Sequence, residues 1–250
     1  FSAGVPKYIA VNDTVASKDY AAADFVATTG VKERRIGDFT TSDLCYEAAE
    51  RLLSDLQWRK EEVGALIFVS QTADYILPAT ACILQDRLGL SKECYALDVA
   101  LGCSGWVYGL SVIAGLLSKE GITKALLLAG DAKKRAQDAS DPLFGHAGTV
   151  TAVEYSEGAA GFKFHVGTDG SGFDAIITPD GGSRNQFTED SLKLIQDSDG
   201  VTRHRLQTVM KGMDVFAFGI TTVPKTVKKL LEKHQISIDS IDYFVFHQAN

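Results

Sequence analysis

The sequence has few cysteines, no long apolar run and no excess of basic residues, and each absence excludes a class of protein. Its four cysteines include no CxxC pair, so we expect neither a zinc site nor a disulfide-rich scaffold. No apolar run approaches the ~20 residues that a membrane-spanning helix needs. Lys and Arg number 25 against 32 Asp and Glu, and phosphate binding favours a basic face, so nucleic acid is not an expected partner.

Signals for targeting and for nucleotide cofactors are also missing. Residues 1–6 contain no basic segment followed by an apolar core, so no signal peptide is expected. Because the chain does not begin with Met, we expect a cytoplasmic protein whose first residues are missing. The phosphate-loop pattern GxxxxGKS or GxxxxGKT is absent, and the glycine-rich stretch 167–172 does not open a helix after a first strand. We therefore expect no cofactor and no metal.

Helical and strand patterns alternate along the first part of the chain, as in an α/β protein with parallel strands. Apolar residues recur at helical spacing over 43–56, whereas the run Val63–Val69 is continuous and rich in strand-forming residues. The same patterns predict four further elements: helices over 80–88 and 104–119, and strands over 94–99 and 125–129.

The second part of the chain is predicted to be more irregular. We expect a polar loop over 133–142, antiparallel strands over 149–155 and 161–166, and turns within the stretch 167–185, which is rich in Gly, Asp and Ser. A helix is expected over 223–234, with Pro224 in its favoured first turn, followed by a buried strand over 241–246.

Two helix-turn-strand segments resemble each other at an offset of 178 positions. Leu52-Leu53 matches Leu230-Leu231, and Leu66-Ile67-Phe68 matches Phe244-Val245-Phe246. A match that extends without gaps over about 17 positions favours a duplicated α/β unit. We therefore expect two domains, residues 1–160 and 161–250, of which the second is incomplete because the copy stops after its matching strand.

Cys103 is the first candidate catalytic residue. A predicted strand leads into a tight turn of small residues, Gly102 to Gly105, and a helix begins there. Helix N-termini have unpaired N–H groups and a partial positive charge, which favour a thiolate nucleophile. The flanking glycines would also let backbone N–H groups form an oxyanion hole. A small buried hydrophobic residue is the alternative, since most free cysteines are of that kind.

His247 is the second candidate. It follows the predicted strand 241–246, and the carboxyl ends of parallel strands are where α/β proteins form their sites. Its neutral Nε2–H would donate to a developing oxyanion. A capping or turn role is the alternative, but in a duplicated fold His247 and Cys103 come from the ends of strands in opposite halves. His146 is a further candidate.

Five segments, taken in order, carry a family resemblance. They are residues 29–35, 77–82, 98–105, 179–184 and 247–250. Together they resemble 3-oxoacyl-ACP synthase III, a family of condensing enzymes in the thiolase superfamily that starts fatty-acid chains. The resemblance extends over essentially the whole chain, and it implies that a few residues at the front and the last quarter are absent.

The resemblance implies an α/β, thiolase-like duplicated five-layer αβαβα fold and a homodimer. It implies that Cys103 takes an acyl group from a thioester, and that His247 and an asparagine beyond Asn250 hold malonyl-ACP during a decarboxylative Claisen condensation. Asn250 itself is not the counterpart of that asparagine. The implied substrate-binding residues are Leu77, Met210, Gly212, Phe216, Ala249 and Asn250.

Departures from the family pattern concern the acyl donor. Members that use coenzyme A stack its adenine between a Trp and an Arg, whose positions here fall at Asp24 and near Asp138, and a nearby cationic position is Thr28. Carboxylates there would repel the phosphates, so a donor bound to acyl-carrier protein is favoured over coenzyme A. The gate residue before Pro78, usually aromatic in the family, is Leu77, which leaves room for a longer or branched acyl chain.

Three other interpretations remain open. A hydroxymethylglutaryl-CoA synthase needs a Glu as acid and base where this chain has Gln71, whose amide cannot take a proton. A non-catalytic or partner-dependent thiolase-like subunit fits the missing asparagine and the altered adenine site. A cysteine hydrolase would use water as the acceptor of the acyl group.

Overall fold

The structure is a computed structural model that describes residues 1–12, 22–132, 143–196 and 200–248. It divides into two compact units, Phe1–Phe162 and Lys163–Asn250. No helix in the described ranges is long and apolar enough to cross a membrane.

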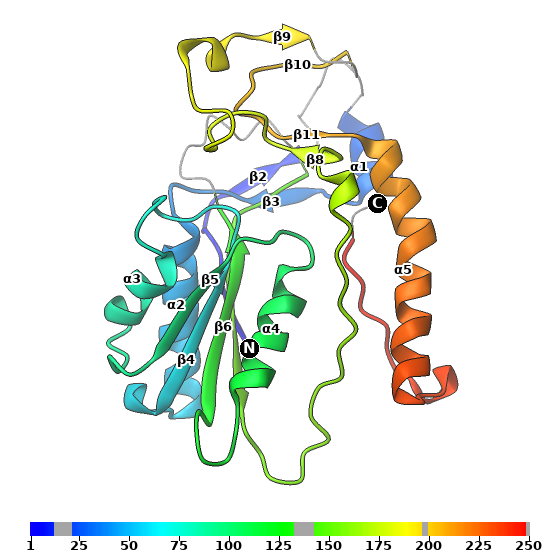
Figure 1. Cartoon of the computed structure of the whole chain (residues 1–250). Coiled ribbons are helices and arrows are strands. Elements are labelled where there is room, and N and C mark those ends of the chain that lie inside the picture. The colour runs from blue at the N-terminus through cyan, green and yellow to red at the C-terminus, as the bar shows by residue number, and fades with distance from the viewer. Residues whose placement is uncertain (13–21, 133–142, 197–199, 249–250) are drawn as a thin grey trace. The chain divides into compact units, whose positions relative to one another are not determined.

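The N-terminal unit is built on a five-stranded sheet with the strand order β1-β7-β6-β4-β5 (Figure 1). Its three parallel strands are β4 (Val63–Val69), β5 (Tyr95–Val99) and β6 (Lys124–Asp131). Strand β7 (Ala147–Glu154) pairs antiparallel with β6, and β1 (Ser2–Gly4) pairs antiparallel with β7. The carboxyl ends of β4, β5 and β6 therefore lie at one end of the sheet, where α/β proteins place their sites.

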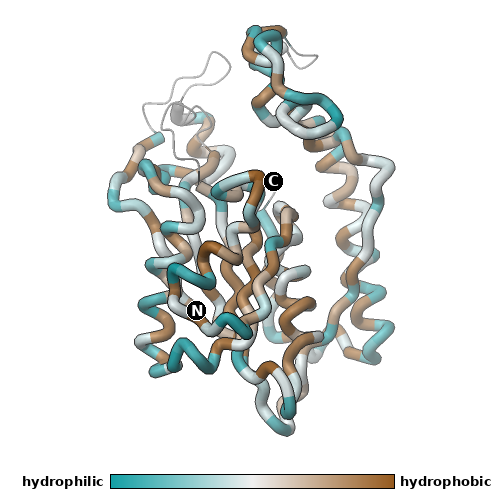
Figure 2. Tube along the Cα trace, turned by 60° about the vertical axis from the view of Figure 1, so that its left-hand side comes forward, coloured by the Kyte–Doolittle hydropathy of each residue, from teal (hydrophilic) through white to brown (hydrophobic). Residues whose placement is uncertain are grey.

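Helices cover both faces of this sheet (Figure 1). Helix α2 (Thr41–Leu56) and helix α3 (Thr80–Arg87) lie on one face, and helix α4 (Gly105–Leu116) lies on the other. The central strands are hydrophobic along most of their length (Figure 2) because both of their faces are covered.

Alternation along β4 divides its side chains between the two faces. Leu66 and Phe68 belong to the buried cluster that includes apolar residues of α2 and α3. Ile67 and Val69 point the other way, toward Gly109 of α4. The continuous apolar run that predicted a doubly buried strand is therefore explained by helices on both sides.

Helix α2 has strong local signals at both ends. The Thr40 hydroxyl accepts from the Asp43 amide at 3.2 Å, and the Asp43 carboxylate accepts from the Thr40 amide at 3.2 Å, which forms a capping box. Gln57 ends the helix in the left-handed conformation, with φ 55°.

A small antiparallel sheet of two strands, β2 (Ile9–Val11) and β3 (Glu33–Arg35), accompanies helix α1 (Ala22–Thr29), which lies between them in the chain. Buried Arg34 donates through Nε to the Asn12 side-chain oxygen at 3.0 Å, and through Nη1 to the Phe144 carbonyl at 3.2 Å. The segment 29–35 is therefore anchored, since the buried guanidinium of Arg34 is hydrogen-bonded to two other segments of the chain.

The C-terminal unit contains short strands and one long helix. Strand β8 (Ile176–Ile177) pairs with β11 (Val209–Met210), and β9 (Ile195–Gln196) pairs with β10 (Thr202–Arg203). Helix α5 (Gly212–His234) follows β11 and contains Pro224 in its interior.

Most elements predicted for the N-terminal unit are confirmed, with boundaries that shift by a few residues. The predicted ranges and the observed elements agree for 43–56, 63–69, 80–88, 94–99, 104–119, 125–129 and 149–155. In each of these segments the apolar residues recur at a regular spacing or form a continuous run, and each segment packs in the sheet or against it.

Three predictions for the second part of the chain are wrong. The structure has no strand over 161–166 or over 241–246, because no described segment pairs with either, and a strand needs a hydrogen-bonded neighbour. The predicted helix over 223–234 is present as part of α5, but α5 begins at Gly212, so Pro224 lies inside the helix and not in its first turn. The loop predicted over 133–142 falls outside the described residues.

Two glycines of the N-terminal unit should respond oppositely to substitution by alanine. A Cβ at Gly148 would lie 2.5 Å from the Cys45 amide nitrogen, whereas a Cβ at Gly115 would have no neighbour within 4 Å. Gly148→Ala should lower the free energy of unfolding by about 1–3 kcal/mol through overpacking. Gly115→Ala, within α4, should raise it by about 0.5–1 kcal/mol. Urea unfolding of both variants checks this, and equal effects would contradict the packing described.

Candidate functional site

Cys103 lies in the turn that joins β5 to α4. Its side chain is exposed. The Gly105 amide closes the turn by donating to the Gly102 carbonyl oxygen at 2.8 Å. Helix α4 follows with Ser104 as its N-cap, and the Ser104 side chain makes no capping hydrogen bond. The structure thus places Cys103 at the carboxyl end of a parallel strand and before a helix, as expected, while its catalytic role stays a prediction.

Close packing of α4 on the sheet fixes this position. A Cβ at Gly105 would lie 2.4 Å from Val69 Cγ1, and a Cβ at Gly109 would lie 2.6 Å from Leu127 Cδ1. Only glycine fits these two positions without a shift of the helix or of the side chains that it meets. Gly105 and Gly109 therefore let α4 approach β4 and β6 closely.

Asp98, near the end of β5, binds the N-terminus of α3. Its two carboxylate oxygens accept from the amides of Thr80 and Ala81, each at 2.7 Å. A carboxylate in this place satisfies two amides that a helix leaves unpaired, and it interacts favourably with the helix dipole. Asp98 therefore joins two of the segments that carry the resemblance, 77–82 and 98–105.

Asp131, the last residue of β6, holds the turn that follows β4. One of its carboxylate oxygens accepts from the Ser70 hydroxyl at 2.9 Å, the Gln71 amide at 2.9 Å and the Thr72 hydroxyl at 3.1 Å. The carboxylate thus connects the ends of β4 and β6 and fixes the backbone of residues 70–72 beside the Cys103 turn.

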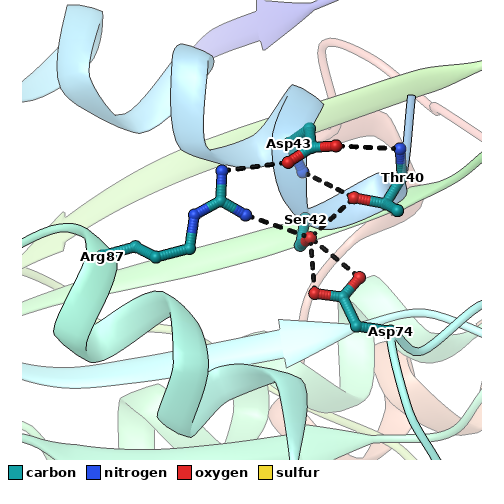
Figure 3. Close-up of polar contacts among 5 residues, drawn as sticks. All are labelled: Thr40, Ser42, Asp43, Asp74 and Arg87. Carbon is teal, nitrogen blue, oxygen red and sulfur yellow. Dashed lines mark hydrogen bonds and ion pairs between the residues drawn. The ribbon is translucent and has the colours of Figure 1, made fainter. Parts of the chain in front are cut away.

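A polar cluster anchors the loop that leads to Leu77 (Figure 3). The Ser42 hydroxyl contacts both carboxylate oxygens of Asp74, at 2.8 and 2.7 Å, and Arg87 pairs with Asp43 at 3.0 Å. Partial burial by itself would raise the pKa of the Asp43 carboxyl, but hydrogen bonds from Thr40 and Arg87 hold it below its ordinary value. The loop is therefore tied to α2 through Ser42, and the Asp74 amide ties it to α3 by donating to the Thr80 hydroxyl at 3.0 Å.

Leu77, the expected gate residue, lies at the tip of that loop. Its side chain is 83% exposed, and the neighbouring Ile76 is 97% exposed. A tip with two exposed large apolar side chains on an anchored base is suited to contact a ligand or a protein surface. Contact of Leu77 with an acyl chain stays a prediction.

The other three cysteines differ from Cys103 in their surroundings. Burial raises the pKa of the Cys45 thiol to about 12 and that of the Cys94 thiol to about 11. Cys82 is exposed on α3. Cys103 and Cys82 are therefore the two exposed thiols, whereas Cys94 is half-buried.

The C-terminal unit has a hollow of about 460 Å³. Met210 and Gly212, two of the expected substrate-binding residues, line it together with basic side chains that include Arg205 and Lys211. Phe216, which the resemblance also implied, is not among the residues that line the hollow. Its side chain is 44% exposed on α5.

Ion pairs organise the wall of this hollow. Arg205 donates to both carboxylate oxygens of Asp180, and these bonds lower the pKa of the Asp180 carboxyl. The Asp174 carboxylate accepts from Lys211 at 2.6 Å, which lowers the pKa of Asp174 and raises that of Lys211. Asp180 also accepts from Ser191 at 2.8 Å, so the segment 179–184 has a structural role here.

The remaining candidates divide between exposed, structural and undescribed positions. His247 is exposed and belongs to the C-terminal unit, so its pairing with Cys103 stays a prediction. It follows no strand, contrary to expectation. His146 contacts the backbone of Gly37 through Nδ1, at 3.1 and 3.3 Å, which indicates a structural role. Ala249 and Asn250 lie outside the described residues, as does Asp138.

Two carboxylates that hold the site were not singled out from the sequence. Asp131 is the last residue of β6, and Asp74 follows the end of β4. Their position near a strand end is the only feature of the sequence that could have marked them as site residues. No group of three or more His, Cys, Asp or Glu side chains within the described ranges is arranged to hold a metal ion.

Comparison with known proteins gives a consistent picture. The family model for 3-oxoacyl-[acyl-carrier-protein (ACP)] synthase III matches residues 97–170, which include Cys103. The chain is 32% identical over 232 residues to a beta-ketoacyl-[acyl-carrier-protein] synthase III of Desulfitobacterium hafniense (strain Y51), covering 90% of this chain and 67% of that protein. It is 34% identical over 231 residues to the protein of that name from Fusobacterium nucleatum subsp. nucleatum, covering 89% and 67%.

Solved structures are similar over the whole chain. A 2.1 Å crystal structure of 3-oxoacyl-(acyl-carrier-protein) synthase III matches with a TM-score of 0.90 at 36% identity, over 100% of this chain and 77% of that chain. A 3-oxoacyl-(acyl-carrier protein) synthase from Burkholderia xenovorans LB400 matches with a TM-score of 0.82 at 35% identity, over 99% and 72%. The likeness confirms the expected α/β, thiolase-like fold class.

The surroundings of the four cysteines predict a pattern of alkylation. At about pH 8, below their raised pKa values of about 12 and about 11, Cys45 and Cys94 remain protonated thiols and should not react with iodoacetamide. Cys103 and Cys82 are exposed and should be labelled. Peptide mass mapping of the folded protein measures this. Labelling of Cys45 before Cys103 would contradict the burial described.

Proposed function

Because the chain belongs to the beta-ketoacyl-ACP synthase III family of acyltransferases, which act in fatty-acid biosynthesis, we propose that Cys103 carries the acyl group during condensation. The exposed thiol in a glycine turn ahead of α4 is the observation that supports this most. The expected division at residue 160 into two thiolase-like halves belongs to the same proposal. The boundary between compact units after Phe162 supports it.

The first half-reaction is acyl transfer to Cys103. The thiolate attacks the carbonyl carbon of an acyl thioester, a new C–S bond forms, and the C–S bond to the carrier breaks. The carrier leaves as a thiol, having taken up the proton that Cys103 gave up. Backbone amides at the start of α4, whose N-cap Ser104 makes no side-chain cap, would stabilise the oxyanion.

The second half-reaction is condensation with a malonyl thioester. His247 Nε2–H donates to the thioester carbonyl oxygen while the C–C bond to the carboxylate breaks and CO₂ leaves. The resulting carbanion attacks the acyl carbon on Cys103. The C–S bond to Cys103 breaks, which restores the thiolate and releases a 3-oxoacyl thioester.

The donor is proposed to be an acyl group on acyl-carrier protein. Asp24 is exposed in the first turn of α1, where a carboxylate would repel the phosphates of coenzyme A. Malonyl-ACP is the proposed extender, and the active form is proposed to be a homodimer. The proposed substrate-binding residues are Leu77, Met210, Gly212, Phe216, Ala249 and Asn250.

Product formation from acyl-ACP and malonyl-ACP tests this function. Cys103→Ala should lower the rate of 3-oxoacyl-ACP formation by about a thousandfold or more, because the covalent intermediate is lost. His247→Ala should lower condensation by about a hundredfold, because one oxyanion donor is lost. The same variant should still form the acyl-enzyme. Mass spectrometry of the products and of the intact protein measures both steps.

The other exposed cysteine provides a matched control. Cys82→Ala should retain the rate of the unsubstituted protein, since Cys82 lies on α3 and not in the turn before α4. If the folded protein forms neither an acyl-enzyme nor product with acyl chains of several lengths, the enzymatic proposal is wrong. A partner-dependent or non-catalytic subunit would then be supported.

A further inference from the structure

The side chain of Gln71 covers the turn that leads to Cys103. A Cβ placed on Gly102 would lie 2.9 Å from Gln71 Oε1 and 3.2 Å from Nε2, so the carboxamide lies directly against Gly102. Gly102 is the residue before Cys103, and consecutive Cα atoms are about 3.8 Å apart. The carboxamide therefore lies beside the residue that precedes the proposed nucleophile.

Hydrogen bonds fix the backbone of Gln71, and its side chain extends from that fixed backbone. Its amide donates to the Asp131 carboxylate at 2.9 Å, and the flanking hydroxyls of Ser70 and Thr72 bind the same oxygen. The Ser70 amide also donates to the Val99 carbonyl at 3.3 Å, which continues the pairing of β4 with β5 up to this turn. The side chain is therefore presented from a fixed base.

The carboxamide of Gln71 has unused hydrogen-bonding capacity. Across the part of the chain that the structure describes, no residue bonds to its side-chain nitrogen or oxygen, and the residue is exposed. An amide offers two N–H donors and one acceptor oxygen. It can exchange water for a carbonyl group of a ligand at little cost in desolvation.

We infer that Gln71 binds the carbonyl oxygen of the acyl thioester through Nε2–H and orients it for attack by Cys103. This inference rests on the proposed function of Cys103. Glycine at position 102 permits this placement of Gln71, because any side chain at that position would collide with the carboxamide. A neutral amide suits this place, since a carboxylate beside Cys103 would disfavour the thiolate and would lack an N–H donor.

The test compares two reactions of the same thiol. Acylation of Cys103 by an acyl-ACP needs a bound carbonyl, whereas alkylation by iodoacetamide reports only the access and ionisation of the thiol. Gln71→Ala should lower the acylation rate about tenfold, as expected for the loss of one hydrogen bond. Alkylation should stay within about twofold of the unsubstituted protein. Peptide mass spectrometry over time gives both rates.

Two further variants sharpen the comparison. Gln71→Glu keeps the size of the side chain but removes the donor, so its ratio of acylation to alkylation should also fall. Gln186→Ala removes an exposed glutamine of the C-terminal unit and should change neither rate. Unchanged acylation in Gln71→Ala, an equal loss of both reactions, or an unchanged ratio in Gln71→Glu would each overturn the inference. If the unsubstituted protein forms no acyl adduct, the proposed function itself fails.

Discussion

The close approach of α4 to β4 and β6 is the contact on which the rest of the site depends. Gly105 and Gly109 leave no room for a Cβ against Val69 and Leu127, so the helix lies on the sheet at a fixed height. The N-terminus of α4, and with it Cys103, is thereby brought to the carboxyl ends of the parallel strands. A helix N-terminus favours an anion, which suits both a thiolate and a developing oxyanion.

Two carboxylates at strand ends extend this constraint to the surrounding loops. Asp98 binds the first amides of α3 and so joins β5 to the loop that carries Leu77. Asp131 binds three groups of residues 70–72 and fixes Gln71 against Gly102. The proposed acyl-carrying thiol, the loop with the proposed gate residue Leu77 and the inferred carbonyl ligand are thus positioned from one end of one sheet. The proposed reaction follows from the family to which the chain belongs. The contacts described here show how the N-terminal unit positions the residues that it would contribute to that reaction.

The N-terminal unit could be predicted largely from its sequence because its periods are strong and its elements pack on one sheet. The turn at Cys103 followed from a strand, small residues and a helical pattern, and the structure has all three. The roles of Asp98, Asp131 and Gln71 could not be predicted, since they arise from contacts between segments far apart in the chain. The strand predictions failed over 161–166, which alternates, and over 241–246, which is an apolar run, because either pattern becomes a strand only when another segment supplies hydrogen bonds.

The central claim is that one thiol, placed by the packing of α4, carries the acyl group. The most direct measurement is a mass map of all four cysteine peptides after the whole protein has been exposed to an acyl-ACP without malonyl-ACP. The account predicts an adduct with the mass of the acyl group on the Cys103 peptide and on no other. An adduct on Cys82, or consumption of the donor with no adduct at Cys103, would contradict it.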